Sequence, residues 1–161
     1  MRIYHGSTEV VEKPEIRKSI RTLDYGSGFY TTTSYSQAED WVRRRIKESE
    51  AAQGYVNIYE MDESAMLTLK CLVFPAPTEE WVDFVMHNRT QKGFTHSFDI
   101  VYGPVANDRV YAAFALYEGG LIKKQQLITE LKTYKLVDQY LFHTDEALGV
   151  LTFIGAKEVK I

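Results

Sequence analysis

Two segments near the N-terminus carry residue types suited to ligand chemistry. His5-Gly6-Ser7 ends a predicted strand, where the imidazole and a backbone edge without a side chain could meet a flat ligand. Residues 23–33, LDYGSGFYTTT, place Gly26 and Gly28 in a glycine-rich turn. A phosphate-binding loop runs into a helix and carries Gly-x-Gly-x-x-Gly or Gly-x-x-x-x-Gly-Lys, whereas here Thr31 replaces the third glycine and its neighbours favour a strand. We therefore expect this turn to lead into a strand and not to hold a phosphate.

Other residues that could support catalysis or bind a metal lack the required pattern. His87, His96 and His143 lie far apart without the spacing of metal ligands, so no metal site is predicted. Cys71, the single cysteine, can form neither a disulfide nor a cysteine-based metal site within the chain. The sequence has no Gly-x-Ser-x-Gly motif, which argues against a serine hydrolase of that type.

The composition is typical of one folded domain. Of the 161 residues, 45% are hydrophobic and 25% are charged, so we expect a single domain over residues 1–161. The net charge of −3 argues against a surface built mainly to bind nucleic acid. No hydrophobic segment of a signal peptide follows the N-terminus, and no apolar run approaches the roughly 20 residues that cross a bilayer. We therefore expect a cytoplasmic protein without membrane contact.

The elements that position these residues are both strands and helices. Strands are predicted over residues 2–6, 29–33, 55–61, 67–74, 98–105, 138–144 and 151–161. A capping box formed by Ser36 and Glu39 predicts the start of a helix that carries Trp41. Further helices are predicted over residues 78–89, 109–118 and 123–135. This order of elements is typical of an α+β fold.

The helix that carries Trp41 also carries a basic cluster, Arg43-Arg44-Arg45 and Lys47. Such a cluster is most simply a solvated helix face, and the alternative is a contact with an acidic partner or nucleic acid. The sequence leaves both interpretations open.

Three segments, taken in order, resemble a known superfamily. They are YHGS (residues 4–7), GSGFYTTTSYSQAEDW (26–41) and DQYLFHT (138–144). Together they resemble the ADP-ribosyltransferase superfamily of the diphtheria-toxin and poly(ADP-ribose) polymerase type. The resemblance implies a single-domain ADP-ribosyltransferase-like fold, with a split β-sheet core and flanking helices. Over nearly its full length, the chain is most similar to a bacterial family of uncharacterised domains in this superfamily. Members of that family are often encoded beside a small partner and are therefore suspected toxins of toxin–antitoxin pairs.

The resemblance also implies a site for NAD as co-substrate. His5 matches the histidine that holds the adenosine ribose, and Gly6 matches the glycine whose backbone groups clamp the nicotinamide amide. Ser7 follows them in the same motif and is included in the implied cofactor-binding set.

The second strand and two helices supply the rest of the implied NAD site. Gly28 sets the turn before the strand, and Tyr30 matches the tyrosine of that strand. Trp41 aligns with the aromatic residue that stacks on nicotinamide. Arg89 and Asn88, at the end of a predicted helix, are candidate contacts to the NAD diphosphate, and the alternative for the arginine is interaction with the dipole of its own helix.

Gln139 departs from the family pattern because it falls where the family has glutamate. Breaking the nicotinamide–ribose bond creates an oxocarbenium-like centre that a carboxylate would stabilise. An amide can accept a hydrogen bond from the ribose 2′-hydroxyl but supplies no charge, which costs on the order of a few kcal/mol of barrier. Asp138 is a poor substitute, because neighbouring strand residues point to opposite faces. The implied catalytic set is His5, Tyr30 and Gln139.

Two functions follow from these residues. The first is an NAD-dependent mono-ADP-ribosyltransferase that acts as a bacterial toxin and is neutralised by a small antitoxin-like protein. The alternative is a catalytically weak or inactive module of the same fold that binds NAD, ADP-ribose or a protein. The acceptor of the ADP-ribose, whether protein, nucleic acid or water, is left open by the sequence.

Overall fold

Two β-sheets and five α-helices make up the part of the chain that this computed structural model describes, residues 1–16, 27–90, 96–105, 108–133 and 136–160. The order of elements confirms the mixed α+β class predicted from the sequence. In chain order the elements are β1 (Arg2–Ser7), β2 (Phe29–Thr31), α1 (Tyr35–Ser49), β3 (Gln53–Met61), the 3-10 helix η1 (Ala65–Thr68), β4 (Cys71–Val73), α2 (Glu79–Thr90), β5 (Ile100–Pro104), α3 (Asp108–Glu118), α4 (Lys124–Lys132), β6 (Asp138–Phe142), α5 (Asp145–Leu148) and β7 (Leu151–Lys160).

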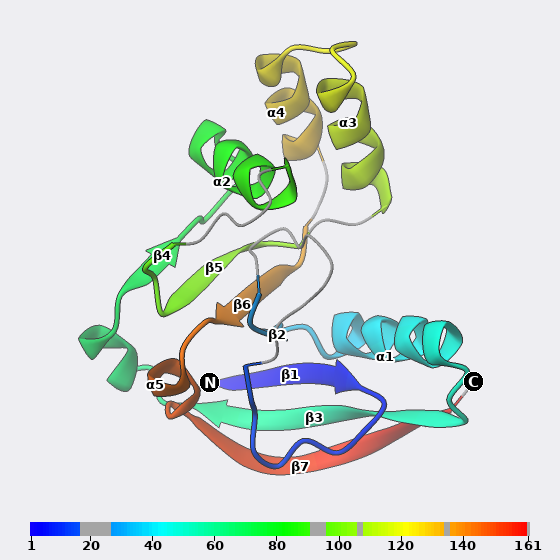
Figure 1. Ribbon diagram of the computed structural model, residues 1–161, viewed down its shortest axis with the longest axis vertical. Helices are drawn as coiled ribbons and strands as arrows, with labels where there is room; N and C mark the ends of the chain where they lie inside the picture. Colours follow the sequence, from blue (N-terminus) through cyan, green and yellow to red (C-terminus); the bar gives the residue numbers. More distant parts are fainter. Residues whose placement is uncertain (17–26, 91–95, 106–107, 134–135, 161) are drawn as a thin grey trace.

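The first sheet has the order β1-β3-β7 and is antiparallel throughout. Helix α1 lies along one face of this sheet (Figure 1). Its buried residues Ala38, Val42 and Ile46 recur every four positions, so they form one stripe that packs on Val56 and Ile58 of β3. This packing fixes α1 directly above the strand that carries His5 and Gly6.

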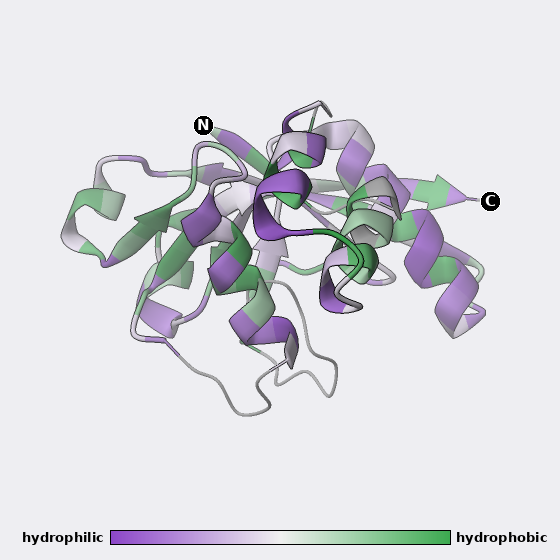
Figure 2. Ribbon diagram, turned by 90° about the horizontal axis from the view of Figure 1, so that it is seen from above, coloured by the Kyte–Doolittle hydropathy of each residue, from purple (hydrophilic) through white to green (hydrophobic). Residues whose placement is uncertain are grey.

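The second sheet has the order β2-β6-β5-β4. Strands β2, β6 and β5 are antiparallel neighbours, and β4 runs parallel to β5 at the edge. Helices α2, α3 and α4 gather on one side of this sheet (Figure 1). Their buried residues share a core with two strand residues; this core includes Trp81, Val85, Phe114, Leu127, Leu131, Val101 and Leu141. Hydrophilic and hydrophobic residues alternate around these helices, as amphipathic packing requires (Figure 2).

A short contact between β1 and β2 joins the two sheets. The backbone N–H of Tyr4 donates to the carbonyl of Thr32 at 2.9 Å, and the N–H of Thr32 donates to the carbonyl of Tyr4 at 3.0 Å. A second hydrophobic core next to this contact combines residues of both sheets, among them Ile3, Tyr59, Phe29 and Phe142. The two sheets and their helices therefore form a single domain.

The start of α1 differs from the sequence prediction. Ser34, not Ser36, is the N-cap, and its hydroxyl accepts a hydrogen bond from the N–H of Gln37 at 3.2 Å. The predicted capping box with Glu39 is therefore wrong. Thr32 and Thr33 bind β1 and β6 through their backbone and side chains, so the chain is held until Ser34 and the helix begins at the next residue.

The predicted strand over residues 67–74 is also only partly correct. Its first residues belong to η1, and the strand β4 is limited to Cys71–Val73. The side chain of Asp62 accepts hydrogen bonds from the N–H groups of Ser64 and Ala65 at 3.1 and 3.3 Å. Such bonds stabilise a turn, and they explain why a 3-10 helix takes the first two residues of the predicted strand.

Candidate functional site

Gly6 presents an unpaired backbone edge where the two sheets meet. Because Tyr4 directs its N–H and C=O towards Thr32, Gly6, two residues further along the same strand, directs its own groups towards the same side. Continuing the antiparallel register places Tyr30 opposite Gly6. Among the described residues, no hydrogen bond occupies the N–H or C=O of Gly6 on this side. One donor and one acceptor are therefore available to a ligand at this edge.

The absence of a side chain at Gly6 lets α1 approach the strand. A Cβ atom at this position would lie 2.5 Å from the carbonyl oxygen of Ala38 and 3.1 Å from the Cβ of Trp41. Trp41 is half-buried, and its Cβ atom lies beside the open backbone edge of Gly6. Gly6 therefore has a packing role in addition to any contact that its backbone makes with a ligand.

His5 links the two sheets next to this edge. Its ring stacks on Phe29 with 4.1 Å between ring centroids and 25° between ring planes. Its Nδ1 lies 2.7 Å from the carbonyl oxygen of Tyr30, which it reaches as a donor when that nitrogen carries the proton. His5 thus fixes Tyr30 relative to Gly6, a role that the sequence did not indicate.

Tyr30 and Gln139 lie on one face of the second sheet. Tyr30 pairs with Leu141, and Gln139 lies two residues before Leu141, so all three side chains point to the same face. Tyr4 and Thr32 pair across the junction, so this face continues onto the side of β1 where Gly6 meets α1.

Gln139 is the second residue of β6 and is only 4% exposed. Its Nε2 donates to the carbonyl oxygen of Pro104 at 3.2 Å. Within the described chain, its Oε1 accepts no hydrogen bond. An amide nitrogen can donate to the Pro104 carbonyl, whereas an ionised carboxylate only accepts hydrogen bonds and could not make the same contact. The free Oε1 is the atom that could accept from a ligand hydroxyl.

Asp138, which opens β6, lies on the opposite face from Gln139. Its carboxylate accepts hydrogen bonds from the N–H of Thr33 at 3.0 Å, the hydroxyl of Thr33 at 2.7 Å and the hydroxyl of Tyr102 at 3.2 Å. Burial and this carboxylate together raise the pKa of Tyr102 to about 12. Asp138 thus connects β6 to the start of α1 and has its acceptor capacity in use.

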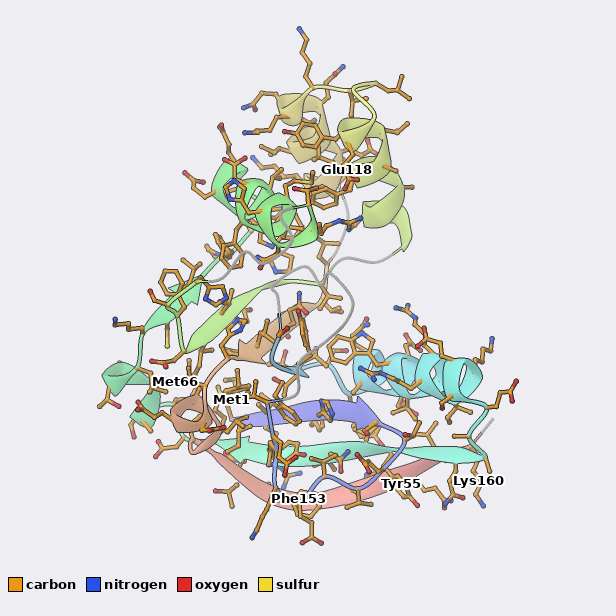
Figure 3. All side chains as sticks on the ribbon, in the orientation of Figure 1. Met1, Tyr55, Met66, Glu118, Phe153 and Lys160 are labelled. Atoms are coloured by element: carbon orange, nitrogen blue, oxygen red, sulfur yellow. The ribbon has the colours of Figure 1, made fainter. Side chains whose placement is uncertain are left out.

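The other predicted site residues have structural partners. Arg89 of α2 forms an ion pair with Glu118 of α3, with Nε and Oε1 3.4 Å apart, and its guanidinium lies 5.4 Å from the ring centroid of Phe114. Glu118 is labelled beside α2 and α3 in Figure 3. The structure therefore ties Arg89 to the α2–α3 contact and not to Gly6.

The glycine-rich turn and the end of β1 complete the predicted set. A Cβ atom at Gly28 would lie 2.6 Å from the carbonyl oxygen of Phe142, so this glycine allows a close approach to β6. The hydroxyl of Ser7 accepts from the N–H of Glu9 at 3.3 Å and stabilises the turn after β1. Gly26 lies outside the described residues.

A histidine pair near the start of β2 was missed in the sequence. The rings of His96 and His143 meet edge to face, with 4.1 Å between centroids. The Nδ1 of His143 lies 2.8 Å from the carbonyl oxygen of Ser27, and its Nε2 is buried without a hydrogen-bond partner in the described structure. Burial, with a contribution from His96, lowers the pKa of His143 to about 4. The two residues are far apart in the sequence, so no spacing pattern could have indicated this pair.

Acidification is expected to destabilise the protein through His143. Its pKa is about 4 in the folded state and 6.5 ordinarily, so the unfolded state binds more protons between these pH values. The contribution of neutral His143 to stability is therefore fully present above pH 6.5 and is lost as the pH falls through 4, by on the order of 3 kcal/mol in total. Urea unfolding at pH 7 and pH 4.5 should show this loss, and His143→Gln should reduce it. An equal loss in the variant would show that other groups cause it.

The described residues contain no group of three or more histidine, cysteine, aspartate or glutamate side chains that could hold a metal ion. Among the described helices, none is long and apolar enough to span a bilayer.

A comparison with protein families identifies the family of this chain. Residues 1–153 match the family described as protein of unknown function (DUF3990). The chain belongs to this family. The match covers β1, β2, α1 and β6, so every predicted site residue lies within the DUF3990 region. No curated protein matches the sequence.

Proposed function

We propose that this DUF3990 protein is an NAD-dependent mono-ADP-ribosyltransferase with a split-sheet ADP-ribosyltransferase-like fold. We further propose that it acts in the cytoplasm as the toxin of a bacterial toxin–antitoxin pair. The observation that carries the proposal is the open backbone edge of Gly6. Trp41 borders this edge from α1, Tyr30 lies opposite it, and the Oε1 of Gln139 is free on the same face.

These groups fit the parts of NAD that must be held during transfer. A carboxamide has one acceptor and one donor, which match the N–H and C=O of Gly6. The nicotinamide ring would contact Trp41 and Tyr30, because flat aromatic surfaces pack favourably on one another. The Oε1 of Gln139 would accept a hydrogen bond from the ribose 2′-hydroxyl and orient the ribose.

The proposed reaction breaks the bond between the ribose C1′ and the nicotinamide nitrogen. Nicotinamide leaves with the bonding electron pair, and the positive charge that develops at C1′ is captured by a nucleophile of the acceptor, which loses its proton. The neutral amide of Gln139 supplies orientation without charge stabilisation. This limits the rate and favours single transfers over chain building.

A binding module without catalysis is the second candidate, and Gln139 is the observation that favours it. An amide in place of the catalytic carboxylate, with its nitrogen bound to Pro104, is compatible with ligand binding alone. Such a module would bind NAD or ADP-ribose and release no nicotinamide.

Expression of the chain without any partner should slow bacterial growth. Tyr30→Ala should relieve the effect, because it removes one wall of the proposed pocket. Tyr55→Ala is the matched control, since Tyr55 lies on the face of the first sheet that points away from α1 (Figure 3). Growth curves at equal soluble expression test this prediction. Normal growth with wild-type protein would remove the toxin assignment and favour the binding module.

A further inference from the structure

The basic cluster of α1 divides into two groups with different surroundings. Arg43 is placed between two carboxylates, 3.5 Å from Oε2 of Glu39 and 3.5 Å from Oδ1 of Asp40. Arg44 and Arg45 are exposed, and neither guanidinium group forms an ion pair or hydrogen bond with a described residue. Within the described part of the chain, these two cations therefore have no carboxylate at ion-pair distance, on a protein whose net charge is −3.

The unpaired arginines lie on the Trp41 side of the helix. Arg44 and Arg45 follow Trp41 by three and four positions, which places them beside it on the helix surface. Arg43 follows Trp41 by two positions and points elsewhere. Arg44 and Arg45 therefore differ from Arg43 in the direction of their side chains as well as in their ion pairing with described residues.

This side of α1 faces the junction between the sheets. A Cβ atom added at Gly6 of β1 would contact Val42 Cγ2 and Trp41 Cβ. A Cβ atom added at Gly54 of the neighbouring strand β3 would instead contact Val42 Cγ1. Trp41 therefore lies on the β1 side of the helix, which is the side of the open Gly6 edge. At the start of the helix, the ring of Tyr35 contacts both edge strands, 5.3 Å from the ring centroid of Tyr4 in β1 and 5.6 Å from Nζ of Lys157 in β7.

We infer that Arg44 and Arg45 bind the diphosphate of a dinucleotide whose nicotinamide occupies the Gly6 edge. The inference rests on the proposed function and identifies a contact for which Arg89 was the candidate in the sequence. In NAD a single ribose separates the nicotinamide from the diphosphate, so the anion must lie near the ring. The turn of helix after Trp41 provides two cations at such a position.

The chemistry of the guanidinium suits this ligand. Arginine stays charged at every physiological pH and donates two parallel hydrogen bonds to phosphate oxygens. Arg89 is already engaged by Glu118, so its use would require breaking an ion pair. Glu48 lies one turn beyond Arg44 on the same side of the helix. Its charge opposes anion binding and limits the affinity.

Calorimetry of the full chain with NAD, ADP-ribose and nicotinamide tests the inference. The double variant Arg44→Gln with Arg45→Gln should bind NAD and ADP-ribose about tenfold to a hundredfold more weakly, because charged hydrogen bonds are lost. Nicotinamide affinity should be unchanged. The matched control, Arg43→Gln with Lys47→Gln, removes the same charge from the same helix and should retain wild-type affinity. All the substituted side chains are exposed, so equal melting temperatures should confirm folding.

The other possible outcomes would contradict this inference, the proposed function, or both. Equal NAD affinity in wild type and the Arg44/Arg45 variant would overturn this inference and leave the proposed function standing. An equal loss in the control variant would show a general charge effect and also overturn it, as would a parallel loss of nicotinamide affinity. If wild-type protein bound none of the three ligands, the proposed function and this inference would both be wrong.

Discussion

Gly6→Ala is expected to lower the free energy of unfolding by roughly 1–3 kcal/mol. The added Cβ would lie 2.5 Å from the carbonyl oxygen of Ala38, and this neighbour is helix backbone that cannot rotate away as a side chain would. Either α1 moves away from the sheet or β1 shifts, and both changes disturb the stripe formed by Ala38, Val42 and Ile46. Urea unfolding of the variant and wild type at pH 7 measures the loss.

Gly155→Ala provides the matched control for Gly6→Ala. Gly155 lies in β7 of the same sheet, and a Cβ atom there would meet no described atom within 4 Å apart from its own residue and chain neighbours. We expect a change between zero and a gain of roughly 1 kcal/mol, since alanine restricts the unfolded chain more than glycine does. If both variants lost the same stability, a general strand effect would replace the contact with α1 as the explanation.

Gln139→Glu is expected to lower the free energy of unfolding at pH 7 by about 2–3 kcal/mol. The position is 4% exposed, and the group now facing the Pro104 carbonyl would be an acceptor instead of a donor. Burial raises the pKa of the introduced carboxyl, and its protonated form can donate to the same carbonyl. The loss should therefore be fully present at high pH and shrink as the pH falls below that raised pKa.

Gln125→Glu is the control for this change. Gln125 is exposed in the first turn of α4, where a carboxylate interacts favourably with the helix dipole, so we expect no loss of stability. Urea unfolding of both variants between pH 5 and pH 8 distinguishes a pH-dependent loss at the buried position from the absence of loss at the exposed one. A pH-independent loss in Gln139→Glu would mean that its side chain does not face the Pro104 carbonyl in the variant.

The features that the sequence predicted are those set by local pattern. The strand around His5, the helix with Trp41 and the strand with Gln139 were all expected, because hydrophobic periodicity and turn residues within each segment specify them. The resemblance motifs also placed Gly6, Tyr30 and Gln139 in one site, and the register of β1, β2 and β6 brings them to one face.

The features that were missed depend on partners distant in the sequence. Ser34 replaces Ser36 as the N-cap because Asp138, more than 100 positions later, binds Thr33 just before the helix. The His96–His143 contact joins a loop to the end of β6. In the same way, the partner of the Gln139 amide is the carbonyl of Pro104 on the neighbouring strand, which no periodicity can indicate.

The most direct test of the proposed activity is nicotinamide release from NAD by the purified full chain, with NAD labelled on its adenylate and a bacterial lysate as the source of acceptors. We expect release above the buffer blank from wild-type protein, label transferred to a macromolecule, and a lower rate for Gln139→Ala, which loses the group that orients the ribose. Gln139→Glu should keep or raise the rate per folded molecule, because a carboxylate stabilises the charge that develops at C1′. Rates equal to the blank for all three proteins would contradict the assignment of this protein as an ADP-ribosyltransferase.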